Sequence, residues 1–366
     1  MKKKTLAIFG CTGSIGNSAL KVYSKNKEKF NLLYLSAHTN YKKLNNIKSK
    51  FKPKKIFLSS QKYSASNIFI DNLFKNKKKI DYVITGVSGY EALEFNFNLL
   101  KISKNLLIAN KETIICGGKF FLNKAKNNNC KIIPIDSEHH CIDLFLNSFD
   151  RKKNIRGVYL TASGGPFLNK KFKYNEKISS VTKHPTWKMG KEISVNSSTL
   201  ANKILELFEA KILFNIPSNH LKIVIDSKSN THAFFEFKNN IYISILHKPS
   251  MEIPISNSLN ISKLNKKIDF CNLNSNFVNV DLKKFPLVKL GYYILNNCNE
   301  AGYVIFTILN ERLVKKYIEN KIKYGEIIDN LISLFKDKKI LKKSKNKLKN
   351  IKDIYKIIKY AKELKI

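Results

Sequence analysis

Short apolar runs alternate with an amphipathic helical pattern over the first third of the chain. Each run is four or five residues long and rich in Leu, Ile or Val, as buried parallel strands are. Five such runs occur, at residues 6–9, 32–36, 82–86, 106–109 and 131–135. Residues 17–25, between the first two runs, have helical spacing. This order predicts an α/β fold that begins with a doubly wound, Rossmann-like parallel sheet.

The pattern changes after the fifth run. Residues 197–210 have the pattern of a loop that enters a helix, and residues 221–225, 233–237 and 241–246 have that of half-buried strands. Residues 260–282 are polar and irregular, whereas the chain from residue 285 is helical in pattern. We therefore predict a cofactor-binding domain, a central α+β catalytic domain, a linker and a small C-terminal helical domain, at residues 1–135, 136–260, 261–283 and 284–366.

A glycine-rich turn joins the first strand to the first helix. Its glycines at 10, 13 and 16 have the G-x-x-G-x-x-G spacing of a dinucleotide-binding loop. Glycine allows a tight turn, close approach of the backbone to a pyrophosphate and helix-to-strand packing, and the helix N-terminus adds N–H donors. The residues expected to contact the cofactor here are Gly10, Thr12, Gly13, Ser14, Ile15 and Gly16.

The end of the second strand indicates which dinucleotide is bound. Folds that bind NAD usually place an acidic residue there for the ribose 2′-hydroxyl, but this chain has Ala37, His38, Thr39 and Asn40, followed by lysines at 42 and 43. The missing acid and the nearby cations favour NADP(H), with Ala37, His38 and Asn40 in contact. In the alternative, these lysines belong to the general lysine excess of the chain.

Two carboxylates follow the fifth run. Asp136 and Glu138 would project on the same side of a strand, beyond its carboxyl end, and would repel each other unless a cation lay between them. Hard oxygen ligands favour Mg²⁺ or Mn²⁺, with Co²⁺ as a further candidate. Glu206, on one helix face with Asn202 and Glu209, can supply a third carboxylate. The alternative for the first pair is a solvated turn.

Other polar residues complete a candidate site. Asn110, Lys111 and Glu112 follow the fourth strand at its carboxyl end, where open α/β sheets bind ligands. Short donors and one cation suit a phosphate monoester, although each donor could instead be an N-cap or turn residue. These four residues are Ser163, Ser197, Asn202 and Lys203.

The charge balance raises the possibility of a nucleic-acid partner. The chain has 67 Lys and Arg against 27 Asp and Glu, a net charge of +40. These lysines are spread along the whole chain with many Asn and Ile residues, so we attribute them to a compositional bias at tolerant surface positions and expect no nucleic-acid partner.

The remaining composition predicts a cytoplasmic protein without a membrane partner. No run approaches the roughly 18 apolar residues of a membrane span, and residues 1–4 lead directly into the first strand without a signal or transit peptide. The six cysteines contain no C-x-x-C pair, so we expect reduced thiols.

Six motifs in this order resemble the 1-deoxy-D-xylulose 5-phosphate reductoisomerase family. They cover residues 5 to about 210 closely and the remainder loosely. The motifs are Gly10-Cys11-Thr12-Gly13-Ser14-Ile15-Gly16, Ala109-Asn110-Lys111-Glu112, Pro134-Ile135-Asp136-Ser137-Glu138-His139, Thr161-Ala162-Ser163-Gly164-Gly165-Pro166-Phe167, His184-Pro185-Thr186-Trp187-Lys188-Met189-Gly190 and Val195-Asn196-Ser197-Ser198-Thr199-Leu200-Ala201-Asn202-Lys203.

The resemblance implies a reaction and a set of residue roles. The family converts 1-deoxy-D-xylulose 5-phosphate to 2-C-methyl-D-erythritol 4-phosphate in the non-mevalonate isoprenoid pathway, by isomerisation and NADPH-dependent reduction. It implies metal ligands at Asp136, Glu138 and Glu206, a catalytic Lys111 beside the substrate, and cofactor contacts at Asn110 and Glu112. Implied substrate contacts are Lys111, Ser137, Glu138, Ser163, His184, Trp187, Met189, Ser197, Asn202, Lys203 and Glu206.

The resemblance also implies a mobile lid at residues 184–190, a homodimer built on the second domain's sheet and a bacterial cytoplasmic enzyme. Trp187, the only tryptophan, could instead be a core residue. The chain departs from the family at Asp226 and Glu252, where the family has His and Arg. We expect these departures to weaken support and stability more than chemistry.

Two other classes remain open. One is an NADP-dependent dehydrogenase without a metal, of the semialdehyde or homoserine type, for which Cys141 beside His139 and His140 is the nearest thiol nucleophile. The other is a basic binding protein without catalysis. Only the metal-dependent reductoisomerase requires three carboxylates to act together.

Overall fold

The computed structural model describes the chain except residues 1, 61–72, 74–77, 150–153, 185–186, 188, 262–266, 270, 272 and 274. The chain folds into two compact units. The first contains residues 1–113, 121–140 and 250–266, and the second contains residues 114–120, 141–249 and 267–366.

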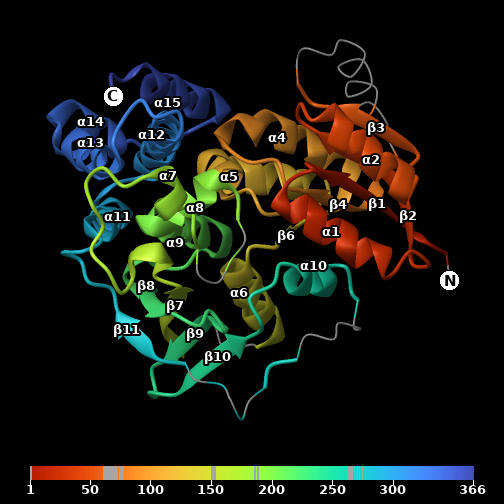
Figure 1. Ribbon diagram of the computed structural model, residues 1–366, viewed down its shortest axis with the longest axis horizontal. Coiled ribbons are helices and arrows are strands. Elements are labelled where there is room, and N and C mark those ends of the chain that lie inside the picture. The colour runs from red at the N-terminus through yellow and green to blue at the C-terminus, as the bar shows by residue number, and fades with distance from the viewer. Residues whose placement is uncertain are drawn as a thin grey trace. The chain divides into compact units, whose positions relative to one another are not determined.

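The first unit is built on a six-stranded sheet with the order β3-β2-β1-β4-β5-β6 (Figure 1). Every pair of neighbouring strands is parallel, and the order reverses direction between β1 and β4. The strands are β1 Lys4–Phe9, β2 Phe30–Ala37, β3 Lys55–Leu58, β4 Ile80–Thr85, β5 Ser103–Ile108 and β6 Lys131–Pro134. This confirms the predicted doubly wound sheet. The edge strand β3 was not predicted, because only its last two residues are buried.

Helices cover this sheet, and one of them comes from far along the chain. They are α1 Ser14–Ser24, α2 Tyr41–Phe51, α4 Leu93–Ile102, α5 Lys111–Asn127 and α10 Glu252–Ser258. Helix α10 packs on α1 (Figure 1), and Ile255, Leu259 and Ile261 share one hydrophobic core with Leu6 and Leu35. A segment beyond residue 250 therefore completes the core of the N-terminal unit.

The second unit contains a mixed sheet with the order β10-β9-β7-β8-β11. Strands β7 and β8 are parallel and the other pairs are antiparallel, which confirms the predicted α+β character. The strands are β7 Ile155–Ala162, β8 Leu221–Asp226, β9 Thr231–Phe237, β10 Tyr242–Leu246 and β11 Phe277–Asn279. Strand β11 corrects the expectation that residues 260–282 are irregular throughout. It is a three-residue, exposed edge strand, too short to give an alternating pattern.

Helices of the second unit fall into two groups. The connection from β7 to β8 contains α7 Ile178–Val181, α8 Lys191–Ser198 and α9 Ala201–Phe214. Helix α6 Ser137–Ser148 precedes β7, and its first four residues belong to the first unit. The C-terminal group confirms the predicted helical region. It contains α11 Pro286–Asn297, α12 Glu300–Ile318, α13 Tyr324–Lys336, α14 Lys338–Ser344 and α15 Ile351–Glu363.

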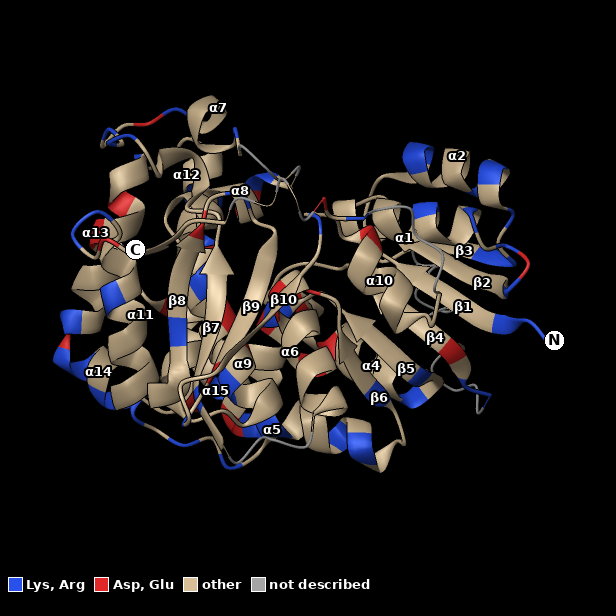
Figure 2. Cartoon of the chain, turned by 90° about the horizontal axis from the view of Figure 1, so that it is seen from below, with Lys and Arg blue, Asp and Glu red and all other residues tan. Residues whose placement is uncertain are grey.

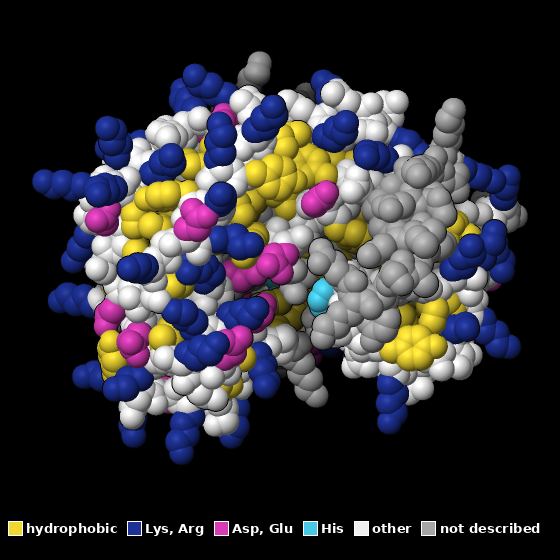
Figure 3. All heavy atoms as spheres, turned by 90° about the horizontal axis from the view of Figure 1, so that it is seen from above, with side chains coloured by type: hydrophobic (Ala, Val, Ile, Leu, Met, Phe, Trp, Pro, Cys, Tyr) yellow, Lys and Arg dark blue, Asp and Glu magenta, His cyan; other side chains and the backbone are white. Residues whose placement is uncertain are grey.

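Basic residues are dispersed rather than gathered. Figure 2 shows Lys and Arg on helices, strands and loops of both units, and Figure 3 shows them separated by uncharged side chains over one face. Among the described residues, no helix has the length and apolar character needed to cross a membrane.

Candidate functional site

The glycine loop leaves the start of α1 open to an anion. Gly13 is the N-cap of α1 and no side chain caps it, so the first N–H groups of the helix remain available to an anion. A Cβ at position 16 would lie 2.4 Å from both Cα of Cys11 and O of Gly10, so only glycine fits there. Both features suit a pyrophosphate laid against the loop.

The loop also receives a positive charge from α2. Nζ of Lys43 donates to O of Thr12 at 2.6 Å. Asn40, expected to contact the cofactor, caps α2 by accepting from N of Lys43 at 2.9 Å, and Nδ1 of His38 lies 3.3 Å from Oγ of Ser59. The structure thus brings Lys43, which the sequence marked only as a general cation, to the glycine-rich turn.

Asn110 fixes the beginning of α5. Its Oδ1 accepts from N of Thr113 at 2.5 Å, and its Nδ2 donates to O of Val87 at 2.8 Å and to O of Gly89 at 3.0 Å. These bonds tie the first turn of α5 to the loop after β4. They therefore hold Lys111, the first residue of α5, in a defined position.

The prediction that Asp136 and Glu138 project on the same side of a strand is wrong. Strand β6 ends at Pro134, and α6 begins at Ser137. N of His140 donates to O of Asp136 at 2.8 Å, so Asp136 immediately precedes the helix and Glu138 lies in its first turn. The two residues are not alternate positions of a strand, because the helix starts earlier than the apolar pattern indicates.

Asp136 forms a buried ion pair. Its Oδ2 lies 2.8 Å from Nζ of Lys111, and the two side chains are 16% and 9% exposed. Burial opposes ionisation of Asp136, but the ammonium of Lys111 and the nearby His139 outweigh it and hold the pKa of Asp136 well below its usual range. Oγ of Ser137 donates to Oε2 of Glu138. Asp136 is therefore an anion at neutral pH.

Helix α9 carries a second group of polar side chains. Oε2 of Glu206 lies 2.6 Å from Nζ of Lys203, and Nδ2 of Asn202 donates to Oε1 of Glu206. The side chains of Glu206 and Lys203 are 1% and 6% exposed. The spacings of four and three residues bring Asn202 and Lys203 to Glu206, and Asn202 and Glu206 share the helix face that the sequence predicts, with Glu209 as its third member. Glu209 is also buried.

Ser163 and His184 meet in the second unit. Nε2 of His184 lies 2.9 Å from Oγ of Ser163, while Nδ1 of His184 lies 2.9 Å from N of Trp187. Burial lowers the pKa of His184 to about 4, so its ring is neutral at pH 7. Because Nδ1 accepts from the backbone of Trp187, the ring proton is on Nε2 and His184 donates to Ser163.

Other residues of the implied lid are placed in part. Trp187 and Met189 are half-buried, and the ring of Trp187 lies edge-on to His232 with 6.2 Å between centroids. Pro185, Thr186 and Lys188 lie outside the described residues. Ser197, at the end of α8, is buried.

The thiol alternative loses support. Cys141 has no exposed surface, and His139 and His140 are also buried. A nucleophile must reach its substrate, so the alternative of a thiol-dependent semialdehyde-type enzyme does not fit this placement.

Sequence reasoning missed the residues that hold the polar side chains of α8. Asn310 of α12 donates from Nδ2 to Oδ1 of Asn196 at 2.9 Å, and Tyr324 of α13 lies 3.0 Å from Oγ of Ser198. The signal in the sequence was a polar Asn310 directly after residues 305–309, which are apolar except for Thr307. Such a residue in a buried helix normally has a partner.

Three family models match the chain. Their descriptions are 1-deoxy-D-xylulose 5-phosphate reductoisomerase over residues 6–118, its C-terminal domain over residues 132–214, and DXP reductoisomerase C-terminal domain over residues 246–364.

Proteins and solved structures that are similar to this chain bear the name of the same reductoisomerase. The 1-deoxy-D-xylulose 5-phosphate reductoisomerase of Pelagibacter ubique (strain HTCC1062) is 36% identical over 384 aligned residues, covering 98% of this chain and 97% of that protein. That of Clostridium novyi (strain NT) is 35% identical, with coverages of 97% and 96%. A crystal structure of DOX-P reductoisomerase in complex with NADPH, fosmidomycin and magnesium is 27% identical, with a TM-score of 0.87 over 98% of this chain and 97% of that chain.

Proposed function

The chain belongs to the 1-deoxy-D-xylulose 5-phosphate reductoisomerase family, and on that basis we propose how its residues carry out the family's reaction. The protein converts 1-deoxy-D-xylulose 5-phosphate to 2-C-methyl-D-erythritol 4-phosphate, using NADPH and a divalent metal ion. It is therefore an NADP-dependent oxidoreductase of isoprenoid biosynthesis.

We assign the metal ligands to Asp136, Glu138 and Glu206. Each of them offers one carboxylate oxygen, Asp136 and Glu138 at the start of α6 and Glu206 on α9. Three hard anionic oxygens suit Mg²⁺ or Mn²⁺. This group is the observation that carries the proposal, because a metal-independent dehydrogenase has no use for it.

The metal, the cofactor and the residues of the chain have separate roles in the reaction. When bound, the metal polarises the substrate's ketone and hydroxyl oxygens, and NADPH supplies the hydride for the reduction step. Asp136 holds the ammonium of Lys111 at 2.8 Å, which orients this cation toward oxygen atoms that gain negative charge during the rearrangement. A lysine placed in this way lowers the barrier by stabilising that negative charge.

Ser163, Ser197, Asn202 and Lys203 bind the substrate phosphate in this proposal. The neutral His184 donates to Ser163, which leaves the hydroxyl proton of Ser163 for a phosphate oxygen. Lys203 supplies the positive charge. The segment with Trp187 and Met189 covers the substrate and excludes water, which strengthens these interactions.

NADPH binds at the glycine loop of the first unit. The uncapped start of α1 and the close approach at Gly16 suit the pyrophosphate, and Lys43 supplies charge to the same turn. Asn110 and Glu112 follow β5, two strands away from β1 in the same parallel sheet, and complete the proposed cofactor contacts.

A spectrophotometric assay tests the reaction directly. Purified protein with 1-deoxy-D-xylulose 5-phosphate, NADPH and Mg²⁺ should lose NADPH absorbance, and EDTA in excess over the metal should stop it. Turnover in EDTA would contradict the metal assignment. No turnover from folded protein that binds NADPH and metal would contradict the reaction.

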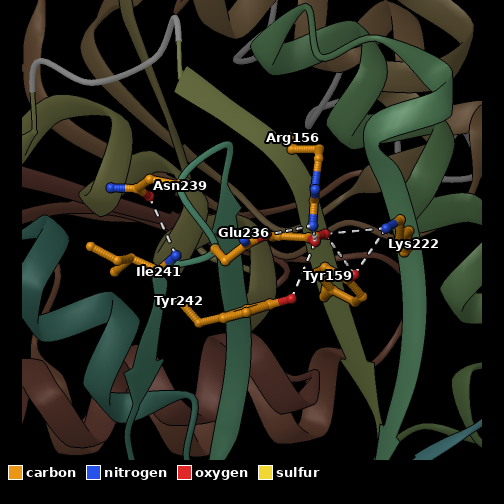
Figure 4. A network of polar contacts seen from close by, with 8 residues as sticks. Arg156, Tyr159, Lys222, Glu236, Asn239, Ile241 and Tyr242 are labelled. Atoms are coloured by element: carbon orange, nitrogen blue, oxygen red, sulfur yellow. Dashed lines mark hydrogen bonds and ion pairs between the residues drawn. The ribbon is translucent and has the colours of Figure 1, made fainter.

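We also propose a homodimer through the outer face of the second unit's sheet. Tyr242 is 55% exposed and Phe277 is 43% exposed on this sheet. Tyr242 belongs to the polar network of Figure 4, in which Glu236 accepts from Tyr242 at 3.2 Å, from Tyr159 at 2.8 Å and from Arg156. Light scattering should show twice the chain mass, and Tyr242→Asp should reduce it.

The remaining proposals concern organisation and location. Residues 1–135 bind NADPH, residues 136–260 bind metal and substrate, residues 261–283 link them to the C-terminal helical domain at 284–366, and the enzyme works in the bacterial cytoplasm. Fractionation of the source cells tests the location.

A further inference from the structure

The helices that carry the proposed phosphate-binding residues rest on the C-terminal helices of the same unit. Helices α8 and α9 both pack against α12, and α9 also packs along α11. The ring of Phe208 in α9 stacks on Tyr303 with 4.6 Å between centroids and meets Phe306 edge-on at 5.7 Å. The C-terminal helices therefore form the apolar support of α9.

One buried polar link joins α12 to the residue before Ser197. Nδ2 of Asn310 donates to Oδ1 of Asn196 at 2.9 Å. Asn310 is 1% exposed and Asn196 is 8% exposed. A hydrogen bond between two buried amides is costly to break, because each group would lose its partner without gaining water.

A second link joins α13 to the residue after Ser197. The hydroxyl of Tyr324 lies 3.0 Å from Oγ of Ser198, and Oγ of Ser198 donates to O of Val195 at 2.7 Å. Since a serine hydroxyl has one proton, Tyr324 is the donor to Ser198. Burial raises the pKa of Tyr324, which keeps this donor protonated. Ser197 thus lies between two anchored neighbours.

Tyr324 also contacts the other phosphate-binding segment. Its ring centroid lies 5.6 Å from that of Phe167, four residues after Ser163. The backbone turn at Gly165 lies against Ser197, since a Cβ at position 165 would be 2.8 Å from O of Ser197. One tyrosine therefore touches both segments that are expected to hold the phosphate.

We infer that Tyr324 and Asn310 are positioning residues for the substrate phosphate. This inference rests on the proposed phosphate site. They act through Ser198 and Asn196 and fix the backbone that presents Ser197. This assigns the C-terminal helical domain a task in substrate binding, which its sequence pattern alone does not indicate. A displacement of Ser197 weakens phosphate binding but leaves the cofactor site of the other unit unaffected.

Tyr324→Phe tests the inference because it removes one hydroxyl and keeps the ring. The expected result is a KM for 1-deoxy-D-xylulose 5-phosphate about fivefold higher, with kcat and NADPH affinity unchanged, as the loss of one hydrogen bond implies. Tyr317→Phe is the matched control. Tyr317 is also buried in this helical group, but its hydroxyl donates to O of Glu176 at 2.8 Å.

A double-mutant cycle shows whether Tyr324 acts through Ser198. Ser198→Ala alone should raise KM, and adding Tyr324→Phe should then have no further effect. Asn310→Leu should raise KM in the same way, because it removes the donor to Asn196. Independent, additive effects of Tyr324→Phe and Ser198→Ala would contradict the proposed route.

Inorganic phosphate provides a readout that does not depend on turnover. Phosphate should raise the melting temperature of the wild-type protein, and Tyr324→Phe should shift this response to higher phosphate concentrations, unlike Tyr317→Phe. An absence of turnover in the wild type would refute the proposed reaction alone. An unchanged KM and phosphate response in Tyr324→Phe, or an equal change in Tyr317→Phe, would overturn the inference.

Discussion

Glu206→Gln removes one proposed metal ligand and the partner of a buried lysine in a single step. The side chains of Glu206 and Lys203 are 1% and 6% exposed, and their charged atoms are 2.6 Å apart. Removal of one member of a buried ion pair typically costs about 3 to 5 kcal/mol, because the other charge stays buried after it loses this partner. We expect the free energy of unfolding, measured without metal at pH 7, to fall by about 3 kcal/mol.

The same substitution should weaken metal use. Loss of one of three anionic ligands should raise the Mg²⁺ concentration needed for half-maximal activity at least tenfold, equivalent to about 1.4 kcal/mol. NADPH affinity should not change, because the glycine loop belongs to the other unit. The measurements are urea unfolding, Mg²⁺ titration of NADPH oxidation and NADPH fluorescence.

Two further variants separate the effects. Glu209→Gln removes a buried carboxylate from the same helix without touching a proposed ligand, so it should leave the Mg²⁺ requirement unchanged. Glu206→Asp keeps the charge beside Lys203 and serves as the test if the Gln variant does not fold. An unaltered Mg²⁺ titration in both variants of Glu206 would refute the assignment of this residue as a ligand.

Three other outcomes are expected. Lys43→Ala should reduce the preference for NADPH over NADH more than Lys42→Ala does. The preference of the wild type should also shrink at high salt. Equal effects of the two variants would contradict the assignment of Lys43 to the cofactor site. Hydrogen bonds to Glu236, of which that from Arg156 has the largest effect, lower the pKa of Glu236 to about 2. The stability that ionised Glu236 contributes is therefore complete above about pH 4.5 and is lost as the pH falls toward 2. Glu236→Gln should flatten acid unfolding in that window, and an unchanged acid profile would contradict this. Asp226→His should lower the melting temperature, because the fully buried Asp226 accepts from N of Thr231 at 3.0 Å. The family has His at this position, so the family pattern alone would suggest the opposite effect. A higher melting temperature would show that this bond is dispensable.

The parts of the fold that follow from local pattern were predictable. Strands such as Lys4–Phe9 and Ile80–Thr85 are buried toward their carboxyl ends, and residues 6–9 and 82–84 appear as apolar runs. The glycine loop is marked by spacing, and the face of α9 with Asn202 and Glu206 follows from helical periodicity. The edge strands Lys55–Leu58 and Phe277–Asn279 were missed because their pairing, not their composition, makes them strands.

The local geometry of the site was less predictable than its residue types. The sequence indicates that Asp136 and Glu138 are acids after a strand, but not that α6 begins between them. Likewise, the pairing of Lys111 with Asp136 joins residues 25 positions apart, and that of Asn196 with Asn310 joins residues 114 positions apart. Such contacts arise from the packing of whole elements and leave no periodic signal.

The placement of α10 on α1 has a consequence for how the protein is made. The core of the first unit lacks Ile255, Leu259 and Ile261 until the ribosome has synthesised residue 261. At translation speeds of about 5 to 20 residues per second, part of the apolar surface of residues 1–140 stays exposed to solvent for on the order of ten seconds. During that interval the nascent chain is a natural client for chaperones. A fragment ending at residue 140 should likewise aggregate unless a peptide of residues 250–266 is supplied in trans.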